Sequence, residues 1–480
     1  MPSEGAGLFS NMLKDNQRKS TRCLVMVALL LAATARSATN AVEVPQWLVQ
    51  PLSLEDAIRT ALNQNGELLK AQNDLEAAHG VAVQTRAIVL PKVRGAASYE
   101  YDAAVEKDPY NSRSIAPPKN EWSGSIRLVQ SIYEGGRMTA AWRASKLIKE
   151  RAYQEYQTVV SDVVLDVRTS YYDVLLAEQQ IVVQEAAVKL LESELENTKR
   201  RMDAGAVPRF NVLRAEVKVA NARPKLIRAR NAHRITKTKL ATTLGYNIPT
   251  NVWDDIPLTL TTKLDTEPYD IALPSALAKA RERRTELHAL RTEIDLQRER
   301  VAIAKSGYKP SLGVFGGYNA HNSEYTQDFN ETVPGALAGV QMTWDIFDGL
   351  ATRGRVSEAR ARQSKATVNL DEQTRRVEQQ VRIAYSSFTE AREVLESQKT
   401  VVERAEEAMR LADSRYEAGT GLQLDVLDAQ TSLTEARTTQ VDAARDYLVA
   451  RARLERAIGL DVTHQQPAVP TKVETWKPAP

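Results

Sequence analysis

Apolar residues recur every 3.5 residues on average along two long stretches of the chain. In the later stretch their spacing alternates between four and three, at Val377, Val381, Ala384, Phe388, Ala391, Leu395, Gln398, Val402, Ala405, Met409, Ala412 and Tyr416. The matching positions of the earlier stretch are Val163, Val167, Ser170, Val174, Ala177, Ile181, Gln184, Val188, Leu191, Leu195, Thr198 and Met202. This sustained period predicts left-handed coiled coils. A helix over 137–202 would be about 100 Å long, which is too long for a compact soluble domain.

Each of these two sets of positions, hereafter a seam, contains one glutamine, Gln184 or Gln398, at the same position of the pattern. It is either a residue that sets the register of the coiled coil or a solvated position at its edge.

Four shorter segments show a period of two instead, which is typical of β-strands. We predict strands at 92–102, 121–132, 311–320 and 335–347. In the last of these, one face carries Ala336, Ala338, Val340, Met342, Trp344 and Ile346. A helix is predicted before each strand pair, at 53–89 and 273–306, and Pro91 or Pro310 ends it.

The chain is an internal repeat. Tyr133–Arg137 (sequence YEGGR) aligns with Phe347–Ala351 (FDGLA) at an offset of 214 residues, and the same offset aligns Gly205 with Gly419. No gap is needed over this region, so chance is a poor explanation. We predict a first repeat at 42–263, a second at 264–460 and a disordered, proline-rich tail at 461–480.

The N-terminus has the layout of a secretory signal peptide, predicted at 1–41. Basic residues precede an apolar run of about 11 residues, which is too short to span a bilayer. Cleavage after Ala35 or Ala41 fits the small residues there. The one cysteine, Cys23, lies in this segment, so the exported chain would suit an oxidising compartment. An uncleaved N-terminal membrane anchor is the alternative.

No later segment is apolar enough for a transmembrane helix, so a membrane-spanning chain would have to use its strands. The four strands alternate apolar and polar residues and are about as long as transmembrane strands. Four strands cannot close a barrel, and open sheet edges are not tolerated in lipid. Several chains must then share one barrel, and a conducting pore favours three or more. A soluble, half-buried sheet is the competing interpretation.

Composition narrows the function further. The 480 residues are 26% charged and only 6% aromatic, and 64 basic against 61 acidic residues leave a net charge of +3. This near balance gives no reason to expect a nucleic-acid partner. The five histidines are scattered, and no nucleophile or phosphate-loop motif is present. We therefore predict no catalytic site, no metal and no cofactor.

The motifs together resemble the TolC-like outer-membrane efflux proteins, also called outer membrane factors. The segments 52–58 (LSLEDAI) and 65–68 (NGEL) are similar to the start of the mature proteins of this family. The YEGGR and FDGL motifs resemble the family's junction from strand to long helix. Its hairpin tip resembles 415–419 (RYEAG) and 425–429 (DVLDA). The resemblance covers about residues 52–460.

This resemblance implies a mainly α membrane protein that works as a homotrimer. Its long coiled-coil helices would form an α-helical barrel through the periplasm, and twelve strands would complete one β-barrel in the lipid of the outer membrane. The implied function is the exit duct of a tripartite efflux or type I secretion system, with a periplasmic adaptor (membrane fusion) protein and an inner-membrane pump as partners. A non-conducting periplasmic scaffold or adaptor is the alternative, and a secreted enzyme is a more distant one.

Two groups of candidate site residues follow. Gly205 and Gly419 come after long helices, where a left-handed turn is expected. The family implies that the adaptor docks at these tips, which comprise Arg201, Gly205, Arg415, Gly419, Gly421 and Leu422. The family also implies a pore gate of Asp425, Asp428, Tyr416 and Asn211, in which acidic rings narrow the periplasmic end and Tyr416 reaches Asn211. Two carboxylates in a first helical turn could instead simply favour the helix dipole.

Overall fold

The computed structural model describes residues 50–102, 119–246, 256–322 and 332–460. The chain divides into a smaller unit, Met1–Pro51 with Pro249–Thr259, and a larger one, Leu52–Ile248 with Leu260–Pro480. In the smaller unit, the backbone N–H of Leu258 donates to the carbonyl of Ile256 at 2.7 Å. All helices and strands below belong to the larger unit. The predicted signal peptide and the predicted tail lie outside the described residues.

The larger unit contains the same order of elements twice. The first half runs α3 (Leu54–Gln64), α4 (Gly66–Arg86), η1 (Ala87–Val89), β1 (Lys92–Asp102), β2 (Lys119–Glu134), α5 (Arg137–Asp203) and α6 (Arg209–Thr243). The second half runs α7 (Leu273–Arg283), α8 (Thr285–Lys305), η2 (Ser306–Tyr308), β3 (Ser311–Asn322), β4 (Thr332–Thr343), α9 (Ala351–Glu417) and α10 (Gln423–Ile458). Helices α5 and α9 have 67 residues each.

The two long helices bury the predicted seams. Every position of both seams is buried or half-buried, and Val163, Val167, Val377 and Val381 are 2% exposed or less. The coiled-coil prediction is therefore confirmed by the packing of α5 on α6 and of α9 on α10. None of the described helices combines the length and the apolar character needed to cross a membrane.

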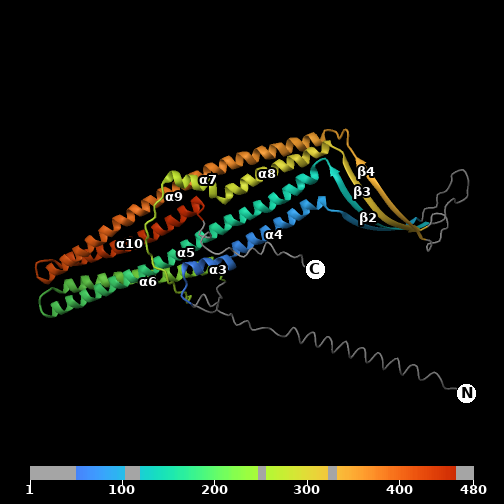
Figure 1. Cartoon of the computed structure of the whole chain (residues 1–480). Helices are drawn as coiled ribbons and strands as arrows, with labels where there is room; N and C mark the ends of the chain where they lie inside the picture. Colours follow the sequence, from blue (N-terminus) through green and yellow to red (C-terminus); the bar gives the residue numbers. More distant parts are fainter. Residues whose placement is uncertain (1–49, 103–118, 247–255, 323–331, 461–480) are drawn as a thin grey trace, which may run out of the picture. The chain divides into compact units, whose positions relative to one another are not determined.

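The helices of the larger unit form one layer. Helix α5 packs on α4, α6, α8 and α10, while α9 packs on α8 and α10. Figure 1 shows α6 and α4 following one another along one side of α5, and α10 and α8 following one another between α5 and α9. Four helices therefore lie abreast toward the hairpin tips (α6, α5, α10, α9) and four toward the sheet (α4, α5, α8, α9).

The prediction of one helix at 53–89 and one at 273–306 was wrong in one respect. Each is two helices, because Asn65 and Arg284 adopt extended backbone angles, with ψ of 129° and 119°. These two residues are 219 positions apart, which is the offset of the repeat in this region. The break lets α3 and α7 turn away while α4 and α8 continue the lines of α6 and α10.

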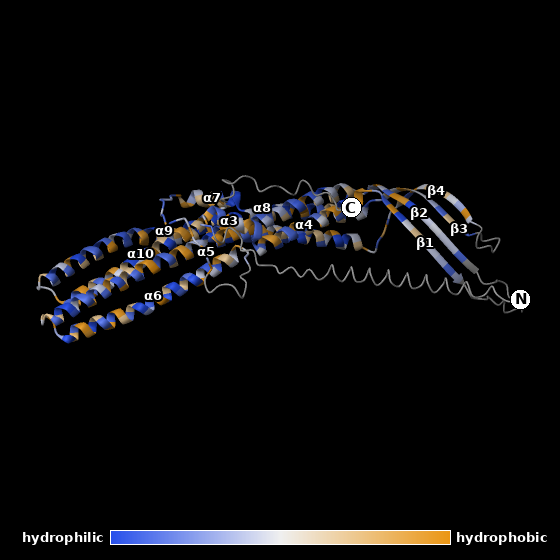
Figure 2. Cartoon of the chain, turned by 90° about the horizontal axis from the view of Figure 1, so that it is seen from below, coloured by the Kyte–Doolittle hydropathy of each residue, from blue (hydrophilic) through white to orange (hydrophobic). Residues whose placement is uncertain are grey.

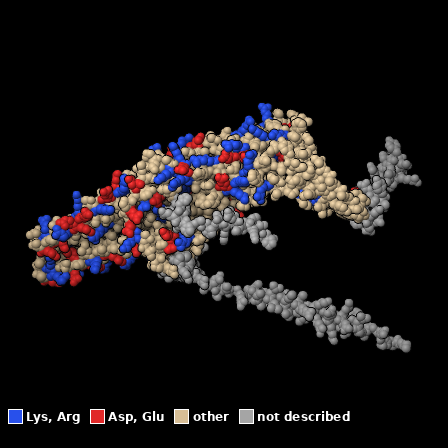
Figure 3. Space-filling view, viewed as in Figure 1, with Lys and Arg blue, Asp and Glu red and all other residues tan. Residues whose placement is uncertain are grey.

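The strands form one antiparallel sheet in the order β1-β2-β3-β4. Directly paired residues share a face, so Val93 lies beside Leu128, Ile126 beside Tyr318, and Leu312 beside Met342. Of these, Val93, Ile126, Leu128, Tyr318 and Met342 are 46–69% exposed. One apolar face thus crosses all four strands, and the face of the sheet that is visible in Figure 3 is nearly free of charge beside the charged helices.

The outer edges of β1 and β4 pair with no other described strand. The predicted strand 335–347 also needs correction, because β4 runs from Thr332 to Thr343. The alternation continues to Ile346, but the Trp344 indole already donates to the Tyr308 carbonyl at 3.3 Å. Asp345 to Phe347 instead lead into the turn at Gly349–Leu350 that precedes α9.

Candidate functional site

Both hairpin tips are built by the same backbone device. Gly205 and Gly419 are left-handed, with φ of 74° and 77°. The N–H of Gly205 donates to Met202 and that of Ala206 to Arg201, at 2.9 and 2.8 Å. This pair of bonds caps the last carbonyls of α5 in a Schellman motif, so the predicted turns are confirmed. No atom lies within 4 Å of where a Cβ would stand on either glycine, so both tips face open space.

The second tip adds a tighter turn. The carbonyl of Arg415 accepts the N–H groups of Thr420 and Gly421, at 3.0 and 2.9 Å. A Cβ on Gly421 would stand 3.1 Å from the Arg415 backbone, which explains the glycine. Leu422 follows with an extended backbone and a side chain that is 67% exposed. The Arg415 side chain is exposed as well.

Arg201 joins the two hairpins. Its guanidinium lies over the Tyr416 ring, 4.3 Å from the centroid, and donates to the Tyr416 carbonyl at 3.4 Å. The ring is buried, but the hydroxyl makes no hydrogen bond with any described residue. The chain therefore brings Tyr416 to Arg201, and the predicted contact from Tyr416 to Asn211 does not form within one chain.

The two predicted gate carboxylates are exposed in the first turns of α10. Asp425 Oδ2 accepts the N–H of Leu422 at 3.3 Å, so this carboxylate caps its own helix. Asp428 lies on the same face and is engaged by no other described side chain. Helix capping thus accounts for Asp425, and it leaves Asp428 to be explained.

Sequence reasoning missed a buried polar cluster behind these tips. The Gln423 amide donates to Thr198 Oγ1 at 2.7 Å and approaches Glu194 Oε1 at 3.4 Å, and all three side chains are 8% exposed or less. Burial raises the pKa of the Glu194 carboxyl, and Asp413 adds to the rise, against hydrogen bonds from Thr198 and Gln423. The matching positions of the second repeat, Ala408 and Ala412, carry no polar group. This difference between the two repeats is the sequence feature that could have revealed the cluster.

Two further sites lie where the stacked helices meet. At the first junction, Asn65 Oδ1 accepts the N–H of Glu67 at 2.8 Å, while its amide donates to the Thr243 carbonyl at 2.7 Å. One side chain thus caps the start of α4 and the end of α6. Gly245 is required beside it, since its φ is +89° and a Cβ would stand 2.2 Å from the Gln64 carbonyl oxygen.

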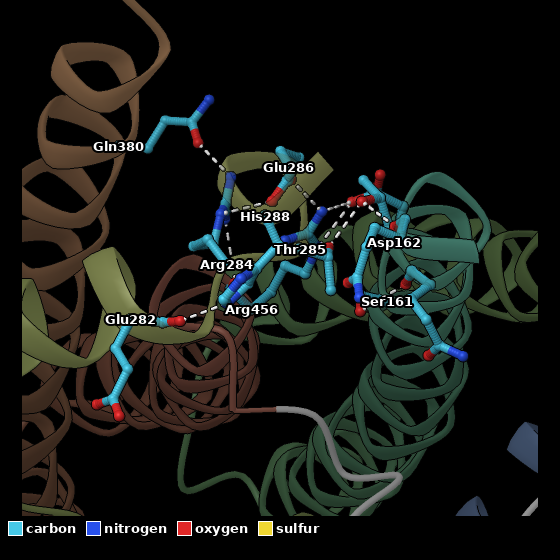
Figure 4. Close-up of polar contacts among 12 residues, drawn as sticks. Ser161, Asp162, Glu282, Arg284, Thr285, Glu286, His288, Gln380 and Arg456 are labelled. Carbon is cyan, nitrogen blue, oxygen red and sulfur yellow. Dashed lines mark hydrogen bonds and ion pairs between the residues drawn. The ribbon is translucent and has the colours of Figure 1, made fainter. Parts of the chain in front are cut away.

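The second junction replaces that asparagine with an ionic network (Figure 4). Arg284 is 5% exposed, donates to the Arg456 carbonyl at 3.1 Å and to Gln380 at 2.8 Å, and pairs with Glu286 at 3.0 Å. Arg456 in turn pairs with both Glu286 and Asp162, each at 2.8 Å. Both arginines hold the pKa of the Glu286 carboxyl below its usual value, despite its burial.

Long helical hairpins that end in exposed tips, joined to a sheet with an apolar face, define the class of outer-membrane efflux channels. The family model for outer membrane efflux proteins matches residues 57–246 and 276–460, and the chain belongs to this family.

Relatives and solved structures agree. The chain is 24% identical to the outer membrane protein TolC of Escherichia coli, over 86% of this chain and 83% of that protein. It is 25% identical to the cobalt-zinc-cadmium resistance protein CzcC of Cupriavidus metallidurans, over 89% and 95%. The CmeC outer membrane channel of Campylobacter jejuni has the same fold, with a TM-score of 0.72 at 17% identity over 85% of each chain. The chain is thus an exit duct of the outer membrane that extends into the periplasm.

Proposed function

We propose that three copies of this chain close into one ring, which conducts solutes from an inner-membrane pump through the periplasm and the outer membrane. The observation that carries the proposal is that the helix layer of one chain ends in two open edges, α6 and α9. Among the described helices, the main partner of α6 is α5 and that of α9 toward the tips is α10, with Arg201 of α5 also reaching Tyr416 of α9. A head-to-tail contact between unlike edges generates a closed ring when the rotation fits.

The α6 edge has a second apolar seam that faces away from α5. It comprises Leu213, Val217, Ala220, Pro224, Ile227 and, beyond Asn231, Ile235. Four of these, Leu213, Val217, Ile227 and Ile235, are 49–66% exposed. Figure 2 shows hydrophobic and hydrophilic positions mixed along this edge helix. An unpartnered seam with a 3.5-residue period is suited to another coiled-coil helix.

The α9 edge matches this seam in pattern and opposes it in charge. Val394, Val401 and Leu411 are 41–49% exposed, and each lies beside a residue of the seam that α9 buries. Helix α6 carries ten basic residues and one acidic residue, whereas 388–417 of α9 carry eight acidic and five basic ones. Opposite charges beside an apolar seam favour one partner and one register.

The open edges of β1 and β4 support the same assembly, because three four-stranded sheets make a twelve-stranded barrel with no free edge. In this assembly the two repeats, 42–263 and 264–460, each contribute a hairpin tip to the periplasmic end. The tips would dock the adaptor, while Asp425 and Asp428 of three chains would form acidic rings at the gate. The role is transport, with no catalytic step.

Cysteine pairing tests the ring directly. Ile227 and Ser397 each lie 22 residues from their tip glycines, at matching depth on the two edges. The variant Ile227→Cys with Ser397→Cys should give a covalent trimer on oxidation, and each single variant should not. Native mass spectrometry in detergent should give a trimer that conducts in planar bilayers. A monomer, or a trimer that does not conduct, would favour the scaffold interpretation.

A further inference from the structure

The two helix junctions enclose matching cavities. The first, about 450 Å³, lies at the α6–α4 junction, and the second, about 440 Å³, at the α10–α8 junction. Their linings correspond through the repeat, with Asn65 matching Arg284, Lys239 matching Arg453 and Thr242 matching Arg456. The chain therefore offers two versions of one cavity, which differ in their side chains.

The charge of the second cavity is not balanced. Its lining contains three arginines, Arg284, Arg453 and Arg456, against Asp162 and Glu286. The first cavity contains two lysines, Lys70 and Lys239, and two acids, Glu67 and Asp166. Positive charge is thus in excess only at the α10–α8 junction.

Arg453 is the source of the excess. Glu286 is shared by Arg284 and Arg456, and Asp162 is taken by Arg456. The exposed Arg453 forms no ion pair with any described residue. Burial lowers the pKa of Arg284, and the opposing effect of Glu286 does not cancel it.

The second cavity opens on the face of the helix layer away from α7. Helix α7 packs on α9 through Arg281, which pairs with Glu378 at 2.7 Å. The α9 residues of the cavity, such as Gln373, Gln380 and Ser387, lie on another side, and no α7 residue lines it. If the face that α7 covers pointed into a duct, α7 would obstruct it. The opposite face, onto which the cavity opens, is therefore the one that suits the inner wall of a duct.

We propose that the α10–α8 cavity binds an oxyanion, the carboxylate or phosphate group of a passing solute. Arg453 and Arg456 are three residues apart on α10 and so share a face, and guanidinium groups pair with such anions through two parallel hydrogen bonds. The Gln373 amide and the Ser387 hydroxyl line the same cavity and are further donors. The location in the duct wall rests on the proposed function, whereas anion binding by the cavity does not.

Calorimetric titration of the purified full-length chain in detergent tests the site. Citrate and inorganic phosphate are titrated separately at constant ionic strength, which distinguishes the carboxylate from the phosphate. Arg453→Gln should weaken binding at least tenfold, and Arg453→Lys should restore part of it. The matched variant Lys239→Gln, at the same position of the first junction, should leave affinity unchanged.

The site is ruled out if neither anion binds, or if Arg453→Gln and Lys239→Gln weaken binding equally. Arg453 is exposed, so unchanged circular dichroism and melting should accompany the loss. Bilayer recordings of the same samples separate the two proposals. A channel that conducts without binding either anion refutes only the cavity site, whereas a sample that binds anions but does not conduct refutes only the duct.

Discussion

Where α5 turns into α6, the residues after the tip glycine include Asn211 and Arg214, whereas the matching residues between α9 and α10 are Asp425 and Asp428. Both turns begin with the same backbone device, a left-handed glycine at the end of a 67-residue helix, although the second adds the Gly421 bond to Arg415. The two tips therefore differ mainly in their side chains. Because backbone hydrogen bonds form the turn, the side chains that follow it can differ in charge. The first tip is basic at Arg214, and the second is acidic at Asp425 and Asp428.

The largest expected effect comes from bulk at the tips. Gly419→Trp should abolish export while trimers remain in the membrane, because the ring projects into open space that a docking partner must enter. Gly419→Ala carries the same left-handed strain, about 1–2 kcal/mol, without the bulk. Export assays with trimer quantification compare the two.

Gly205→Trp then asks whether the tips are equivalent. A similar loss from both tryptophan variants indicates that both dock the adaptor. Normal export from both would refute the docking assignment, and an equal loss in Gly419→Ala would attribute the effect to the turn.

The next effect is on ion selectivity. Asp425→Asn with Asp428→Asn should reduce cation selectivity and the block by trivalent cations several-fold, because rings of carboxylates favour cations. Asparagine can still cap α10, so the helix start is retained. Reversal potentials and blocking titrations in planar bilayers measure both changes. Glu435→Gln, an exposed acid farther along α10, is the control. Unchanged selectivity in the double variant would reduce these aspartates to helix-capping residues.

A smaller effect should depend on pH. The raised pKa of Glu194 means that the folded tip favours the neutral carboxyl. The stability it contributes is fully present below the ordinary pKa of 4.5 and is lost as pH rises through the higher folded value. The contact between α5 and α10 should therefore loosen above that window.

Conductance against pH measures this effect, in the Asp425→Asn, Asp428→Asn background to remove the titration of the gate. Conductance should rise with pH in that background and stay flat when Glu194→Gln is added. Glu192→Gln, an exposed acid two residues away that pairs with Arg223, should keep the slope. A slope that survives Glu194→Gln would assign the titration elsewhere.

The smallest effect should come from Tyr416→Phe. The hydroxyl has no hydrogen-bond partner among the described residues, so its removal should change stability by less than about 0.5 kcal/mol. Tyr416→Leu also removes the ring contact with Arg201, which is worth about 1–2 kcal/mol at a partly buried site. Denaturant melts of the trimer compare the two. A large loss in Tyr416→Phe would mean that the hydroxyl bonds to a neighbouring chain.

Periodicity predicted most of the fold, because the seams and the strand faces are repeated along the chain. It missed the breaks at Asn65 and Arg284, since each depends on one residue whose partner is about 180 positions away. It also missed Glu194 and Gln423, because a buried polar pair interrupts a seam without changing its period. The strand end at Thr343 was misplaced because the alternation continues into the turn. The tip residues were found through the family resemblance, and their roles remain predictions.

The unpaired edges of β1 and β4 also govern how the protein is made. A lone chain presents an apolar sheet with two rows of free backbone donors and acceptors, which is a template for faulty aggregation. In the proposed trimer the last of those groups are satisfied only when the third chain arrives, so part of the stability of the sheet depends on the concentration of the chain. Assembly should then depend steeply on the concentration of newly exported chains. Until the trimer closes, the exposed sheet of each chain needs protection from aggregation in the periplasm.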